Sequence, residues 1–165
     1  MDIPHKHYDA DFYGWAHEQA DLIRHGHLSQ LDIDNLIEEI EDMGNRHYDK
    51  LESAFGTLLA HLLKWRYQSE RTPNKSWQLT IAEQRRRIDK CLERNPSLKG
   101  RAEEAMAEGY HYGKIKAAKE TPFSVEDFPD TCEWDYAQVT DDNFYPAPGV
   151  IGIHKPWKAS QKGKR

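Results

Sequence analysis

The sequence contains no apolar run long enough to span a membrane. Its strongest apolar run, residues 54–65 of the 165, is interrupted by Gly56, Thr57, His61 and Lys64. A transmembrane helix needs about 20 predominantly apolar residues. The first residues also carry neither the basic segment nor the apolar segment of a secretory signal. We therefore expect a soluble protein that is neither membrane-bound nor exported.

Cysteine is scarce and metal-binding spacings are incomplete. Cys91 and Cys132 are the two cysteines of the chain, and unpaired thiols are typical of a reducing compartment. Glu108 and His111 have the Glu-x-x-His spacing of di-iron helical bundles, but such a site needs a second copy of the motif, which is missing. We expect a cytoplasmic protein with no bound metal and no other cofactor.

Common catalytic signatures are missing as well. The chain has no phosphate-binding loop, no dinucleotide-binding glycine pattern and no Gly-x-Ser-x-Gly nucleophile turn. The absence of these patterns makes an enzyme the less favoured interpretation, although it leaves that question open.

Charge is distributed unevenly along the chain. The net charge is −5, and residues 155–165 contain five cations and no acid. The rest of the chain is therefore −10, which argues against a nucleic-acid partner. Residues 147–165 have the composition of a flexible basic tail.

What the sequence does contain is helical periodicity. Apolar residues at spacings of three and four predict five helices, which end or begin at capping and stop residues. Expected caps or stops, in chain order, are Asp9 or Asp11, Gly26, Asp32, Asn74 or Ser76, Asn95-Pro96, Ser97, Ser124, and Asp130 or Thr131.

Two features of these helices bear on packing. The pattern runs on both sides of Gly44, so the helices before and after it are either separate or joined in one kinked helix. The fifth helix carries small residues that would let a neighbouring helix approach closely, namely Ala102, Ala105, Gly109 and Gly113. We predict an all-α fold: a bundle of about five helices in a single domain over residues 8–146, followed by a short irregular C-terminal segment and the flexible tail.

A set of short motifs resembles a known family. It consists of Asp11-Phe12-Tyr13-Gly14-Trp15, Leu31-Asp32-Ile33-Asp34-Asn35-Leu36, residues 38–44, His61-Leu62-Leu63-Lys64-Trp65, Ser76-Trp77, Gln84-Arg85-Arg86-Arg87-Ile88, Pro96-Ser97-Leu98 and Phe128-Pro129. In this order they resemble the family called domain of unknown function 29. The resemblance implies a bacterial, largely α-helical protein with no assigned activity. One departure is that Cys132 is followed by Glu133, where relatives commonly have proline.

Polar residues occur at core spacing and suggest a polar pocket. Gln84 lies on the apolar stripe of its helix, Gln19 lies on that of the first helix, and His61 shares a face with Leu58 and Trp65. An unpaired buried polar group costs about 1–3 kcal/mol, so each needs a partner. The candidate pocket comprises Glu38, Glu41, His61, Gln84 and Arg85. Either His61 is an acid or base that Glu41 orients, or these groups form a hydrogen-bond network that fixes helix register.

Opposite charges gather in two other stretches. Residues 32–52 contain eight acids against two bases, and residues 85–101 contain seven bases against two acids. They pair with one another inside the bundle or face solvent. If they face solvent, the candidate basic surface comprises Arg86, Arg87, Lys90 and Arg94.

Two classes of function follow. The favoured interpretation is a non-enzymatic interaction module that binds a protein partner or a second copy of itself. The alternative is an uncharacterised hydrolase or phosphoesterase that uses the polar pocket around His61. A second alternative is weak nucleic-acid contact through residues 85–101 or the basic tail.

Overall fold

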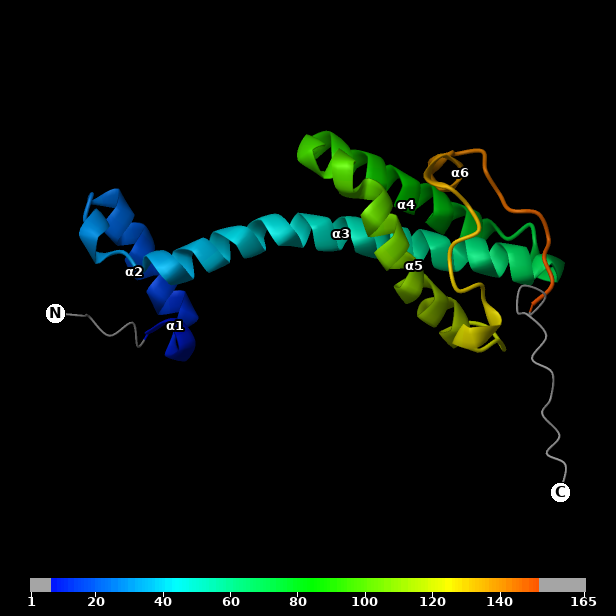
Figure 1. The fold of residues 1–165 in the computed structure, drawn as a ribbon, viewed down its shortest axis with the longest axis horizontal. Helices are drawn as coiled ribbons and strands as arrows, with labels where there is room; N and C mark the ends of the chain where they lie inside the picture. The colour runs from blue at the N-terminus through cyan, green and yellow to red at the C-terminus, as the bar shows by residue number, and fades with distance from the viewer. Residues whose placement is uncertain (1–6, 152–165) are drawn as a thin grey trace, which may run out of the picture. The chain divides into compact units, whose positions relative to one another are not determined.

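The longest described helix, α3, runs from Ile33 to Tyr67 and takes part in two compact units (Figure 1). The computed structural model describes residues 7–151, and the division between the units falls between Arg46 and His47. Six α-helices and four short 3-10 helices, with no strand, occur within this described range. The all-α prediction is therefore confirmed, while a single domain over residues 8–146 stays a prediction.

The first unit is a helical hairpin. It contains α1 (His7–Ala10), α2 (Phe12–Arg24), the 3-10 turn η1 (Leu28–Gln30) and the beginning of α3. The Asp11 carboxylate accepts a hydrogen bond from the Gly14 amide and caps α2. Gly26 follows α2 with a φ of 75°, a left-handed conformation that glycine adopts without steric cost. Both residues confirm the expected ends of the first helix.

A buried aspartate joins the two arms of the hairpin. The Asp32 carboxylate accepts a hydrogen bond from Trp15 Nε1 at 3.1 Å, and the Asp32 amide donates to Gln19 Oε1 at 2.8 Å. The same carboxylate accepts from the Asn35 backbone and side-chain amides at the start of α3. Gln19 is buried, as its spacing predicts, and Asp32 is its partner.

Gly44 does not interrupt the helix. α3 continues through it without a break. A glycine in a helix interior costs about 1 kcal/mol relative to alanine, which is too little to end a helix that packing stabilises further along. The segments before and after Gly44 are therefore one helix.

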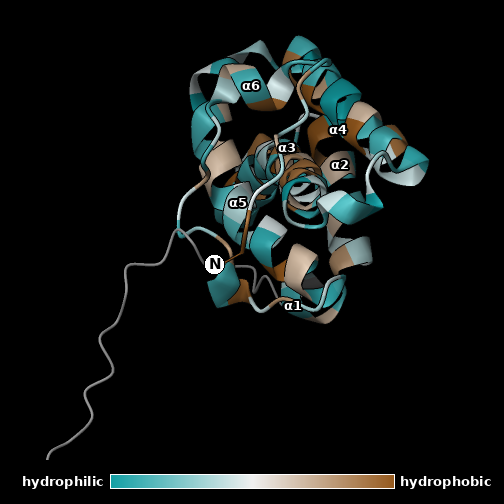
Figure 2. Cartoon of the chain, turned by 90° about the vertical axis from the view of Figure 1, so that its right-hand side faces the viewer, coloured by the Kyte–Doolittle hydropathy of each residue, from teal (hydrophilic) through white to brown (hydrophobic). Residues whose placement is uncertain are grey.

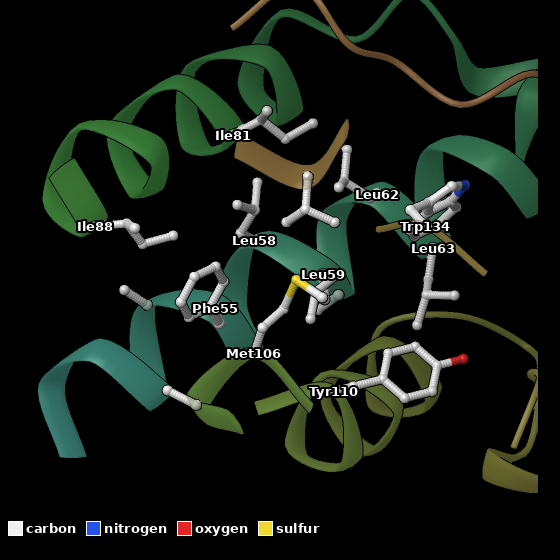
Figure 3. Packing of buried hydrophobic residues seen from close by; sticks show 14 of the residues in the cluster. Phe55, Leu58, Leu59, Leu62, Leu63, Ile81, Ile88, Met106, Tyr110 and Trp134 are labelled. Atoms are coloured by element: carbon white, nitrogen blue, oxygen red, sulfur yellow. The ribbon is translucent and has the colours of Figure 1, made fainter. Parts of the chain in front are cut away.

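The second unit has a hydrophobic core around the later part of α3. Helix α4 (Lys75–Arg94) packs on one side of α3 and α5 (Ala102–Lys119) on the other. Figure 3 shows Ile81 and Ile88 pointing from α4 toward Leu58 and Phe55 of α3, with Met106 approaching from α5. In Figure 2 hydrophobic residues of α4 lie on its α3 side, while Leu79 of the same helix is exposed. Nearly every side of α3 is buried here, as the apolar run 54–65 predicts.

Glycines allow α3 and α5 to approach closely. A Cβ atom added at Gly109 would lie 2.7 Å from the Glu52 carbonyl oxygen, and one at Gly113 would lie 2.9 Å from the Gly56 carbonyl oxygen. Real Cβ atoms do not approach backbone oxygens so closely, so only glycine fits at both positions. The prediction that small residues of the fifth helix let a neighbour approach is confirmed.

Two predicted helix starts are wrong. Ser97 does not cap α5, because Pro96–Arg101 forms the 3-10 helix η3 and α5 begins at Ala102. The last helix, α6 (Tyr136–Thr140), is capped by Asp135 and not by Asp130 or Thr131. Asp135 and Gln138 exchange hydrogen bonds as a capping box, which fixes the start of that helix.

The remaining turns connect these helices. They are η2 (Ser69–Arg71) before α4 and η4 (Val125–Asp127) before α6. Asn74 caps α4 and Ser124 caps η4, and both are among the predicted caps.

Part of the predicted flexible tail is held against α3. The Gly149 amide donates to the Arg66 carbonyl oxygen at 2.9 Å, and Arg66 Nη1 donates to the Ala147 carbonyl oxygen at 3.1 Å. The beginning of the segment that the sequence assigns to the tail therefore makes backbone contacts with α3. The five cations of residues 155–165 lie outside the described residues.

Candidate functional site

His61 lies in a chain of buried hydrogen bonds. Its side chain is 8% exposed, its Nδ1 lies 2.9 Å from the Thr57 carbonyl oxygen, and its Nε2 lies 3.3 Å from Lys64 Nζ. A carbonyl only accepts, so Nδ1 carries the proton and Nε2 accepts from lysine. Burial lowers the pKa of His61, which keeps the ring neutral. Both ring nitrogens are therefore occupied.

The chain of hydrogen bonds continues from Lys64 to the end of α5. Lys64 is buried, contacts the Glu120 carboxylate and lies 5.2 Å from the centre of the Trp77 ring. Burial by itself raises the pKa of Glu120, but the hydrogen bond and charge of Lys64 outweigh it and lower the net pKa. Lys64, Glu120 and the neutral His61 thus all have hydrogen-bond partners. Of the two interpretations of His61, this geometry supports the hydrogen-bond network that fixes helix register.

Gln84 and Arg85 are both buried, but their side chains contact different parts of the protein. Arg85 is 1% exposed and donates to the backbone carbonyl oxygens of Val139, Asp142 and Phe144 at 2.9, 3.3 and 2.7 Å. It therefore attaches the irregular C-terminal segment to α4. Gln84 instead lines a groove between α3 and α4. The idea of a contiguous exposed basic stretch beginning at Arg85 is wrong, because this guanidinium is enclosed by the carbonyls that it binds.

Glu38 and Glu41 belong to a different compact unit from His61. Both are exposed and belong to the first unit, and Glu41 precedes His61 by 20 residues on the same helix. The groups that contact or charge the His61 ring come from Thr57, Lys64 and the end of α5. The described partners of His61 therefore all belong to the second unit.

The predicted basic surface is exposed along α4. Arg86, Arg87, Lys90 and Arg94 are all solvent-accessible. Within the described range, the ion pairs of residues 85–101 are Arg87 with Glu83 and Arg101 with Glu104, both over three or four residues. Pairing between the acidic stretch 32–52 and this basic stretch is thus not seen there. Apart from the buried Asp32 and Arg85, most charged side chains of the two stretches are exposed.

The most unusual surface belongs to the first unit. Within residues 8–46, the buried residues are Trp15, Gln19 and Asp32, of which two are polar. Large apolar side chains are exposed on the same hairpin instead, and we call the following set the N-terminal apolar face: Phe12, Ile23, Leu28, Ile33, Ile37, Ile40 and Met43.

The spacing of these residues explains the face. On α3, Ile33, Ile37 and Ile40 recur at steps of four and three and form one stripe. Phe12 and Ile23 lie three helical turns apart on α2, with Ala16 and Ala20 between them on the same stripe. The pattern predicts the apolar stripes of these helices correctly. It does not reveal that the apolar side of the hairpin is left exposed.

No group of three or more His, Cys, Asp and Glu side chains arranged to hold a metal ion is found between residues 7 and 151. None of the helices described there is long and apolar enough to cross a membrane.

Comparison with known proteins gives one match. The model of the family described as Domain of unknown function DUF29 matches residues 7–145, which span both units. No curated protein and no solved structure matches the sequence.

Proposed function

The chain belongs to the family described as Domain of unknown function DUF29, and we propose that it is a docking module that binds a basic amphipathic helix of a partner protein. The binding surface is the N-terminal apolar face. The observation that carries the proposal is that the first unit, within its described residues, exposes eight large apolar side chains and fully buries a single one, Trp15, while Leu22, Leu31 and Leu36 are half-buried.

The size of the exposed face supports a partner. Eight of the twelve large apolar side chains that are exposed in the described structure belong to the first unit. Fully burying one such side chain contributes about 1.5–3 kcal/mol, and contiguous exposed apolar surface is typical of interaction sites. A partner that covers this face would therefore add buried apolar surface to a unit whose own core is small.

Charge selects the kind of partner. Residues 7–46 contain ten acids and two bases, a net charge of −8, whereas residues 47–151 carry −2. Successive helical residues turn by about 100°, so Asp34 and Glu41 fall beside the Ile37 position on α3. An apolar stripe bordered by carboxylates is complementary to an apolar stripe bordered by lysine or arginine. In this account Glu38 and Glu41, with their exposed carboxylates, attract the partner and do not orient His61.

The same charge disfavours a second copy as the occupant. Two such hairpins would each bring a net charge of −8 to one interface, and like charges placed together reduce affinity. We therefore assign a basic helix of a partner protein to the N-terminal apolar face. The experiment must distinguish this binding from homodimerisation.

We also propose that the docking takes place in the bacterial cytoplasm. Cys91 and Cys132 are both free thiols, which suits a reducing compartment.

The test uses a matched pair of substitutions in the full chain. The probe is an 18-residue synthetic helix of leucine and lysine in amphipathic register, labelled for fluorescence anisotropy, with a leucine–glutamate peptide of the same register as its counterpart. Ile40→Glu places a charge in the proposed interface. Leu79→Glu is the control, because Leu79 on α4 is 62% exposed and Ile40 is 64% exposed.

The expected result is that the lysine peptide binds and the glutamate peptide does not. Ile40→Glu should weaken binding at least tenfold, Leu79→Glu should leave it unchanged, and added salt should weaken it. Equal loss in both variants would contradict the proposal. Light scattering measures the mass of the free chain in solution. If the chain is a stable dimer and Ile40→Glu dissociates it, the occupant of the N-terminal apolar face is a second copy of the chain and not a basic helix.

A further inference from the structure

A groove of about 560 Å³ lies between α3 and α4 in the second unit. Its lining comes from residues at steps of three and four on both helices, so one face of each helix forms one wall. The lining residues include Lys50, Ser53 and Thr57 on α3, and Gln84, Lys90 and Arg94 on α4. None of these residues belongs to the N-terminal apolar face.

Gln84 places a polar side chain on this groove. The residue as a whole is 7% exposed, and it is among the residues that line the groove. In the described part of the chain, the fully enclosed side-chain atoms without a hydrogen bond are Arg66 Nε and Gln68 Oε1, so the Gln84 amide is open to the groove. Its neighbour Arg85 instead donates to backbone carbonyl oxygens of the C-terminal segment. A polar ligand in the groove would hydrogen-bond to the Gln84 amide.

The groove is also strongly basic. Lys50, Arg87, Lys90 and Arg94 line it against one carboxylate, that of Asp49. Arg87 pairs with Glu83 at 2.7 Å, whereas the other three cations make no ion pair within residues 7–151. Clustered, unpaired cations on a concave surface attract anions, and arginine in particular binds phosphate through parallel hydrogen bonds.

The uncharged lining narrows the ligand class. No phenylalanine, tyrosine or tryptophan is among the residues that line the groove, and its one aromatic ring is the imidazole of His47, so a flat nucleobase has little ring surface to stack on. Ser53 and Gln84 offer hydrogen bonds instead, which suit hydroxyl groups. The volume falls within the range of about 300–1,000 Å³ for small-molecule sites. We propose that the groove binds a phosphorylated polyol or sugar, with its phosphates on the cations and a hydroxyl on Gln84.

Binding, and not covalent chemistry, is the activity proposed for this groove. Cys91 lies in it, but burial raises the pKa of its thiol, and its Sγ donates to the His47 carbonyl oxygen at 3.6 Å. A neutral thiol is a weak nucleophile.

Calorimetric titration of the full chain tests this inference. The probes are glucose 6-phosphate, fructose 1,6-bisphosphate and inositol 1,4,5-trisphosphate, with fructose and inositol as uncharged counterparts and inorganic pyrophosphate as an anion without hydroxyl groups on carbon. Arg94→Gln and Gln84→Leu alter the groove. Arg86→Gln is the matched control, because Arg86 is exposed on the same helix and does not line the groove.

The expected result is binding that strengthens with the number of phosphates and is absent for the uncharged compounds. Arg94→Gln should weaken it at least tenfold, Gln84→Leu about fivefold, and Arg86→Gln not at all. In ¹⁵N spectra the Gln84 side-chain amide should shift on titration.

Several results would overturn the inference. They are no heat with any phosphorylated probe, equal weakening by Arg86→Gln and Arg94→Gln, and pyrophosphate that binds as tightly as the bisphosphate. Because the groove and the N-terminal apolar face share no residue, failure here leaves the docking proposal standing, and the reverse also holds.

Discussion

Replacing single glycines by alanine at two places in the fold should have opposite effects on stability. At Gly44, in the exposed part of α3, an added Cβ has no atom within 4 Å. Alanine is favoured over glycine in a helix interior by about 1 kcal/mol. Gly44→Ala should therefore raise the free energy of unfolding by about 0.5–1 kcal/mol.

At Gly109 the same substitution meets the backbone of α3. The new Cβ would lie 2.7 Å from the Glu52 carbonyl oxygen and 3.0 Å from the Gly56 amide nitrogen. Neither atom can move unless the helix moves, so the cost should reach or exceed the upper part of the usual range for overpacking, about 1–3 kcal/mol. After the gain in helix propensity, Gly109→Ala should lower the free energy of unfolding by about 2 kcal/mol.

Urea and thermal unfolding, followed by circular dichroism, measure both effects. For a chain of this length, about 2 kcal/mol corresponds to a decrease in Tm of about 4–8 °C. If Gly109→Ala were as stable as Gly44→Ala, the close approach of α3 and α5 would be refuted, and with it the packing of the second unit.

Two other perturbations test the buried polar groups. Because burial lowers the pKa of His61, the unfolded chain holds its proton more tightly than the folded chain. The free energy of unfolding should then be fully maintained above about pH 6.5 and decrease as the pH falls toward the folded pKa. In His61→Gln this part of the decrease should disappear in urea titrations across that range, and an unchanged pH profile would contradict the assignment. Arg85→Met removes three hydrogen bonds to the C-terminal segment, so amide exchange over residues 136–145 should accelerate. Arg86→Met, at an exposed position, should leave that exchange unchanged, and equal exchange in the two variants would argue against the attachment.

Local features of the fold could be predicted from the sequence because their causes are local. Asp11 and Asn74 cap helices through hydrogen bonds that span three residues, and Gly26 ends a helix through its own φ. Helical periodicity likewise identified Gln19 and Gln84 as buried polar residues. The start of α6 is different: the sequence predicts Asp130 or Thr131 as its cap, whereas Asp135 and Gln138 form the capping box.

Long-range partners could not be predicted because periodicity gives the face of a helix and not its neighbour. The carbonyls that bind Arg85 lie 54 or more residues away, in a segment without periodicity. The sequence suggests Glu41 and His61 as partners because a carboxylate can orient an imidazole. Both residues lie on the continuous helix α3, 20 residues apart, and residues so far apart on one helix cannot contact each other. The stripe that contains Ile37 and Ile40 has the three- and four-residue spacing of a buried helix face. A pattern does not distinguish a face that the chain covers from one that a partner covers.

The N-terminal apolar face is tested most directly by hydrogen–deuterium exchange of the full chain with and without the leucine–lysine helix. Docking on this face predicts new protection confined to α2 and to residues 33–43 of α3, and its loss in Ile40→Glu. Protection that is confined to the second unit, or that is the same in wild type and Ile40→Glu, would contradict the account.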